Sequence, residues 1–137
     1  MTKLGSIPSF AVALFIGLLP AVATAQQSED CEHLELTQRT IRLAGSFTAE
    51  RPEKFYCFSA RRGQQARIII VPQTADLNTQ GSLRFPHGDL EPGGPGGLIF
   101  DEQLPEDGLY RLRIGQRFGE KKAGEFDLII ELDGRRK

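Results

Sequence analysis

Side chains that could perform chemistry are few in this chain, and their spacing matches no known catalytic pattern. The two histidines, His33 and His87, stand far apart and neither lies in an evident base-and-acid arrangement. The serines lie in no Gly-x-Ser-x-Gly elbow, the setting of a hydrolase nucleophile. These patterns predict no catalytic residue and indicate that the protein is not an enzyme.

The two cysteines, Cys31 and Cys57, allow a disulfide or a metal or redox site. Their spacing is not Cys-x-x-Cys, and only His33 and His87 could add soft metal ligands. In an oxidising compartment two such thiols usually pair. The spacing, together with the export predicted below from the N-terminus, favours a structural disulfide. In the chain-entropy model, closing this loop would add roughly 3–4 kcal/mol to the free energy of unfolding.

Glycines and acids suggest two further kinds of site. Residues 93–97 are glycine-rich, but neither the lysine nor the helix of a phosphate-binding loop follows them. Six acidic residues occur in expected turns: Asp76, Asp89, Asp101, Glu102, Glu106 and Asp107. None forms an EF-hand loop, and solvated turns explain them more simply than calcium does, although calcium binding stays open. We expect no cofactor and no metal centre.

Basic residues form three short clusters, at positions 61–62, 121–122 and 135–137. Arg111 and Arg113 are also predicted to share one strand face, where they could meet an acidic partner or a polyanion. The formal net charge is only −1, and exposed aromatics do not alternate with the basic residues. The sequence therefore predicts no nucleic-acid binding and favours solubility and protection of strand edges.

The N-terminus has the layout of a secretory signal peptide. Lys3 precedes an apolar run at residues 10–19, and Ala23-Thr24-Ala25 offers a small-x-small cleavage site. The run is about half the ~20 residues that span a bilayer. Residues 1–25 are therefore predicted to be removed, leaving one domain at 26–137 that is periplasmic or secreted and not inserted in a membrane.

Period-2 alternation dominates the remaining sequence and identifies the elements that would position any site. Seven short runs read as strands: 40–43, 54–59, 67–71, 83–85, 98–100, 110–114 and 126–132. Turn-forming residues separate them, and residues 86–97, rich in proline and glycine, are expected to be the longest loop. The pattern predicts an all-β fold, a small antiparallel, jelly-roll-like β-sandwich of about seven strands.

Two stretches in this order resemble the bacterial pre-peptidase C-terminal domain family. The first is the aromatic run 55–58 followed by a Gly-Gln turn and a β-branched run. The second is 104–114, a Leu-Pro-x-x-Gly-x-Tyr start to a strand, followed by 124–128. The resemblance covers roughly residues 44–132. It implies a small β-sandwich of the kind that serves as a non-catalytic appendage of proteases.

The chain is also similar, in length and order of motifs, to the periplasmic inhibitors of g-type lysozyme. In those inhibitors a Ser-Gly-x-Tyr loop reaches into the lysozyme cleft. The matching positions here are Asp107, Gly108 and Tyr110, with aspartate in place of serine. The resemblance thus points to a partner-binding loop of Glu106, Asp107, Gly108 and Tyr110. Alternatively, Gly108 only forms the turn, and Tyr110 packs in the core with its hydroxyl capping that turn.

The sequence as a whole favours an exported, non-catalytic binding module. The more specific hypothesis is that this module inhibits a bacterial cell-wall lytic enzyme. The expected partner is a protein, with a lysozyme as the candidate, or a glycan. The alternative is an accessory or structural envelope domain related to pre-peptidase C-terminal domains, with no inhibitory activity. Nothing in the sequence indicates the oligomeric state.

Overall fold

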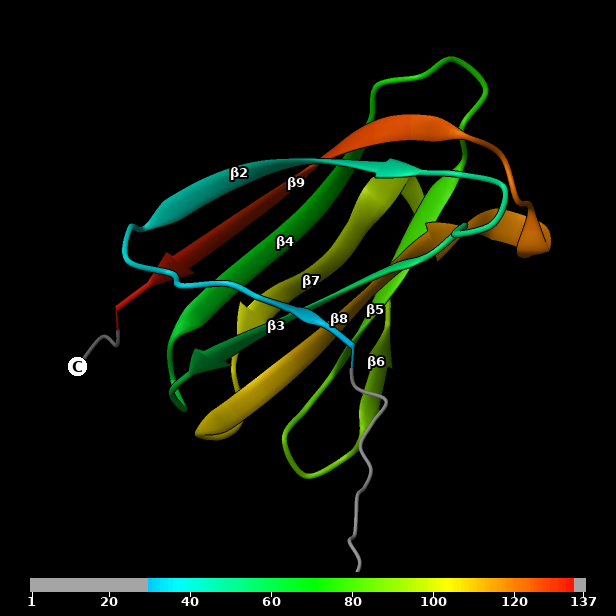
Figure 1. Ribbon diagram of the computed structural model, residues 1–137. Helices are drawn as coiled ribbons and strands as arrows, with labels where there is room; N and C mark the ends of the chain where they lie inside the picture. Colours follow the sequence, from blue (N-terminus) through cyan, green and yellow to red (C-terminus); the bar gives the residue numbers. More distant parts are fainter. Residues whose placement is uncertain (1–29, 135–137) are drawn as a thin grey trace, which may run out of the picture.

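The computed structural model describes residues 30–134, and strands make up almost all of its regular structure (Figure 1). The strands are β1 (Glu32–His33), β2 (Thr40–Phe47), β3 (Lys54–Ala60), β4 (Gln65–Pro72), β5 (Thr79–Arg84), β6 (Leu90–Pro92), β7 (Leu98–Gln103), β8 (Gly108–Gln116) and β9 (Gly124–Asp133). Two single-turn 3₁₀ helices, η1 (Pro95–Gly97) and η2 (Arg117–Gly119), lie in connections. The predicted all-β fold is confirmed.

The strands form two sheets that pack face to face. One has the order β1-β3-β8-β5-β6 and the other β2-β9-β4-β7. All pairs are antiparallel except β1 with β3. Without β1, two four-stranded sheets remain, and the chain passes from one to the other at every connection except the β5–β6 hairpin, which is the jelly-roll order that the sequence predicted.

Two strands account for the difference between the predicted seven and the nine observed in residues 30–134. β1 has two residues and β6 has three, so neither is long enough to show period-2 alternation. β6 lies inside the segment expected to be the longest loop, where it pairs with the edge of β5. That expectation was therefore only partly right, because tertiary pairing orders a proline- and glycine-rich segment.

The core lies between the two sheets and follows from the alternation along each strand. On β8, Tyr110, Leu112 and Ile114 are fully buried, whereas Arg111 and Arg113 point away from the core. The facing sheet contributes buried side chains such as Ile68, Leu128 and Ile130. Burial of this apolar surface is the main force that holds the sheets together.

A disulfide joins Cys31 to Cys57, with their Cα atoms 5.6 Å apart. It fastens the segment of β1 to β3, and the amide of Leu34 adds a 2.8 Å hydrogen bond to the carbonyl of Cys57. His33 lies near both sulfur atoms, but the bonded sulfurs offer no thiolate to a metal ion. The structural interpretation of the two cysteines is thus confirmed.

The predicted signal peptide, residues 1–25, lies outside the described residues. Within residues 30–134, no helix reaches the length and hydrophobicity needed to cross a bilayer.

Candidate functional site

Three turns meet at one end of the sandwich, and we call this region the loop end. They are residues 61–64 between β3 and β4, 85–89 between β5 and β6, and 104–107 between β7 and β8 (Figure 1). Leu104 connects two of them, because its amide donates to Gln64 and its carbonyl accepts from Gly63, both at 2.8 Å. The chain is therefore anchored two residues before Glu106, where the predicted partner-binding loop begins.

Glu106 attaches the loop to the neighbouring turn through His87. Its Oε2 contacts Nδ1 of His87 and accepts a 3.3 Å hydrogen bond from the His87 amide. On the other side of the imidazole, Nε2 lies 2.9 Å from Oδ2 of Asp89. Both ring nitrogens are thus engaged by carboxylates, so this histidine is placed to hold two turns together rather than to activate a nucleophile.

Asp107 and Gly108 complete the attachment. Oδ1 of Asp107 accepts a 2.8 Å hydrogen bond from the amide of Arg62, on the third turn. Gly108 has a φ of 139°, and a Cβ at this position would stand 2.9 Å from Cβ of Pro86. A side chain here would separate the two turns and strain the backbone, so only glycine fits.

Tyr110 supports the loop from below. Its side chain is fully buried, with its ring centroid 5.7 Å from that of Phe58 and 5.8 Å from that of Phe85. Its hydroxyl donates to the carbonyl of Glu106 at 2.7 Å and accepts from the Glu106 amide at 3.2 Å. Burial, aided by the nearby Asp107 carboxylate, raises the pKa of the Tyr110 phenol.

The four residues singled out from the sequence therefore take different positions. Asp107 and Gly108 are exposed and Glu106 is half-buried, whereas Tyr110 is buried beneath the loop and orients it. Its position is that of the packed, turn-capping alternative. Sequence reasoning named His87 and Asp89 but did not connect them with Glu106, because a contact between separate turns leaves no local pattern.

Comparison with known proteins identifies the fold. No protein-family model matches the chain, and no curated protein matches it by sequence. A periplasmic inhibitor of g-type lysozyme, PliG, from Salmonella Typhimurium has a similar structure, with a TM-score of 0.56 and 21% identity over 74% of this chain and 97% of that one. PliG from Aeromonas hydrophila gives a TM-score of 0.56 and 16% identity over 75% and 96%.

The pre-peptidase C-terminal domain of a collagenase from Bacillus anthracis is also similar, with a TM-score of 0.61 and 12% identity over 78% of this chain and all of that domain. At such identities these similarities establish a shared fold. They confirm the resemblance to both groups that the sequence motifs indicated.

Proposed function

We propose that the protein is an exported, non-catalytic binding module whose loop end blocks the cleft of a g-type lysozyme. The observation that carries this proposal is the loop of residues 105–108, which is exposed yet fixed by three different neighbours. Tyr110 holds its backbone from below, and His87 and the Arg62 amide hold its two acidic side chains. A fixed loop loses little conformational freedom when it binds, so more of the contact energy appears as affinity.

The chemistry of the loop end suits occlusion rather than catalysis. Three acidic side chains, those of Asp89, Glu106 and Asp107, gather on two adjacent turns and would complement a cationic partner surface. The adjoining turn also carries the exposed Arg61 and Arg62, so the fit depends on where each charge meets the partner. A protruding turn can fill a catalytic groove without any reaction of its own.

The similar structures also support a function as a lysozyme inhibitor. The two PliG proteins are periplasmic inhibitors of g-type lysozyme, and the match spans nearly their whole length. By analogy we assign this protein to an extracytoplasmic compartment and to the non-enzymes. This chain differs from those inhibitors at Asp107, which occupies the position of the serine in their Ser-Gly-x-Tyr loop. The aspartate would add a negative charge to the surface that contacts the lysozyme.

Inhibition of purified lysozymes tests the proposal directly. The mature protein should inhibit a g-type lysozyme, in a panel of c-, g- and i-type enzymes, with about micromolar affinity or better, which corresponds to roughly −8 kcal/mol. Inhibition of none of the three would refute the proposal. The similarity to a collagenase appendage would then favour an accessory or structural envelope domain.

A paired charge reversal tests the surface. The double variant Glu106→Lys, Asp107→Lys should stay folded, because its contacts lie at the exposed end of the sandwich, yet it should lose inhibition. The matched control is Glu50→Lys, Glu125→Lys, which makes the same charge change at exposed positions near the opposite end. Retained inhibition in the first variant, or equal loss in the control, would show that the loop end is not the binding surface.

A further inference from the structure

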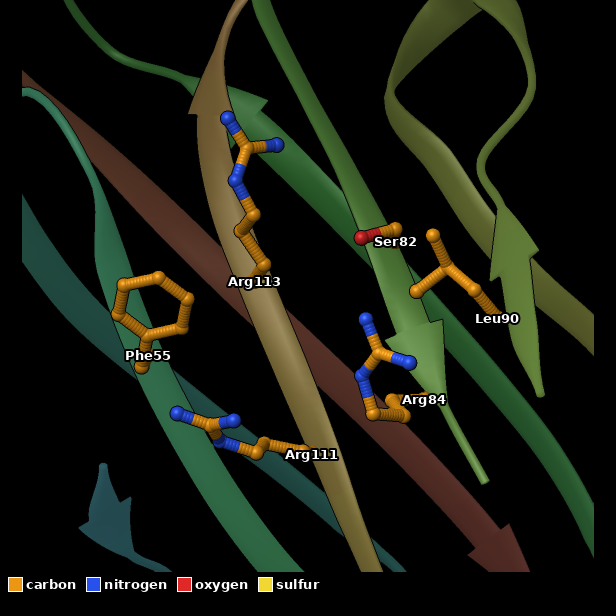
Figure 2. Close-up of a pocket in the computed structure, with 6 residues that line it drawn as sticks. All are labelled: Phe55, Ser82, Arg84, Leu90, Arg111 and Arg113. Carbon is orange, nitrogen blue, oxygen red and sulfur yellow. The ribbon is translucent and has the colours of Figure 1, made fainter. Parts of the chain in front are cut away.

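The outward side of the β1-β3-β8-β5-β6 sheet carries a hollow of about 300 Å³, away from the 105–108 loop. Its lining consists of Phe55, Ser82, Arg84, Leu90, Arg111 and Arg113, and we call this surface the arginine face. Figure 2 shows the arginines rising from β8 and β5, with Phe55 on one side and Leu90 on the other. The volume suits one or two small rings.

The strand register concentrates positive charge on this face. Arg84 on β5 stands directly opposite Arg111 on β8, and Arg113 follows two residues further along the same face. Like charges directly opposite each other destabilise an antiparallel pair. The lining of the hollow includes no acidic residue, although the formal net charge of the chain is −1. An anionic ligand beside Arg84 and Arg113 would complement the charge of this face.

The surroundings position the arginines without removing their binding capacity. Arg113 contacts Glu53, with a 3.2 Å hydrogen bond from Nε, and Nη1 of Arg84 donates to the Gly88 carbonyl at 2.7 Å. The guanidinium carbon of Arg111 lies 5.4 Å from the ring centroid of Phe55. A guanidinium has five N–H donors in a rigid fork, so Arg84 and Arg113 keep donors beyond these contacts.

Nearby acids limit where an anion can bind. Asp30, Glu32 and Glu53 line an adjoining hollow on the β1 side of Arg111, together with Arg51 and Lys54. An anion is therefore favoured on the β5 side, between Arg84 and Arg113, where the Ser82 hydroxyl adds a further polar group. Glu53 offsets part of the charge of Arg113 but lies outside the lining.

The donor set indicates the chemical class of the ligand. Guanidinium groups only donate hydrogen bonds, and strand pairing already uses the backbone of β8 and β5. A peptide backbone would leave its own N–H groups without acceptors on such a surface. A sugar acid instead offers carboxylate oxygens for bidentate contacts with arginine and C–H faces for Phe55 and Leu90.

We propose that the arginine face binds an acidic oligosaccharide, a short chain of sugar rings that carry carboxylate groups. A carboxylate lies between Arg84 and Arg113, within reach of Ser82, and a ring packs against Phe55 or Leu90. This site is separate from the loop end and does not depend on lysozyme inhibition.

Trigalacturonate is a suitable probe, and NMR titration of the mature protein at about 20 mM salt, where screening is weak, is a suitable measurement. We expect saturable shifts of the Phe55, Ser82 and Leu90 amides, weakened at least tenfold by Arg84→Gln, Arg113→Gln. The control is Arg39→Gln, Arg42→Gln, which removes two arginines that form ion pairs on the other sheet, and it should bind as the wild type does.

The proposal would be overturned by no saturable shift in the wild type, by an equal loss in the control, or by equal binding of the neutral maltotriose. Equal binding of inorganic sulfate would also overturn it, because the site would then recognise only an anion. Phe55→Ala provides a second variant that leaves all three arginines in place. It should weaken trigalacturonate more than sulfate, and an equal effect on both would contradict a ring contact.

Discussion

The loop end, at one end of the sandwich, lies next to the arginine face, on the outer side of one sheet, yet the two regions hold their charged side chains differently. At the loop end each acid has an internal contact, since Glu106 and Asp89 flank His87 and Asp107 accepts from a backbone amide. On the arginine face, Arg84 and Arg111 stand opposite each other despite their like charge. The loop end thus gathers acidic side chains that are held in place by neighbouring turns, whereas the arginine face gathers three arginines on two adjacent strands.

The difference separates two ways of binding. The contacts of its acids fix the shape of the 105–108 loop, so the loop end contributes a rigid form that can fill a groove. Concentrated arginines create a field that attracts an anion and that salt weakens. Arg84 links the regions, because it donates to Gly88 in the turn that also contains His87. The following changes test whether the two regions are as independent as this contrast implies.

The largest effect is expected from Leu112→Asp, which should unfold the protein and so abolish binding at both the loop end and the arginine face. Leu112 is fully buried on β8 between Arg111 and Arg113. Burying an unpaired carboxylate costs several kcal/mol, a large share of a typical stability of about 5–15 kcal/mol. The variant should lose its β-sheet circular dichroism. The control Leu109→Asp, at a 46% exposed position of the same strand, should stay folded; a stable Leu112→Asp protein would contradict the assigned core face.

The long strands were predictable from sequence because each has one face in the core. Alternation along β8 placed Leu112 inside and Arg111 and Arg113 on the outer face, as the structure shows. β1 and β6 were not predictable, because two or three residues are too few for a periodic signal and their pairing is set by tertiary contacts.

The candidate sites were only partly predictable for a related reason. Motif resemblance pointed to Glu106, Asp107, Gly108 and Tyr110, but the contact of Glu106 with His87 joins turns that are distant in sequence. Arg84 likewise joins Arg111 only through the register of β5 against β8. Such register depends on the whole fold, so residue spacing alone cannot reveal it.

The second-largest effect is expected from loss of the Cys31–Cys57 disulfide. This loss should destabilise the structure around the arginine face more than the loop end. Native exported protein should contain no free thiol, and reduction should lower the free energy of unfolding by about 3–4 kcal/mol. Cys57 on β3 is the cross-strand neighbour of Arg111, and β1, which pairs with β3 and carries the other end of the link, should loosen first.

Denaturant unfolding and amide exchange of the Cys31→Ala, Cys57→Ala variant measure this effect. Exchange should accelerate at the Leu34 amide, which bonds to Cys57, more than at the Leu104 amide of the loop end. Two titratable thiols in native exported material would contradict the disulfide. Equal acceleration at both amides would contradict the independence of the two regions.

The smallest effect is expected from Tyr110→Phe, which should loosen only the loop end. The substitution removes the two hydrogen bonds to the Glu106 backbone but keeps the ring between Phe58 and Phe85. Since Glu106 can exchange these bonds for water, the loss of stability should be about 1 kcal/mol. Exchange of the Glu106 amide should accelerate, while trigalacturonate binding by the arginine face should not change.

The same variant carries a pH signature. The pKa of Tyr110 is raised in the fold by burial and by Asp107, and that of Tyr56 is raised by burial and by Glu32. Their stabilising contribution is complete below about pH 10, where unfolded tyrosine begins to ionise, and declines as pH rises toward the folded values. Each tyrosine that ionises only when unfolded lowers the free energy of unfolding by about 1.4 kcal/mol per pH unit.

Tyr110→Phe should therefore make the alkaline decline of the free energy of unfolding shallower. Tyr56→Phe, the matched control, should do the same without accelerating Glu106 exchange, and acceleration in both variants would show that the loop end depends on the core as a whole.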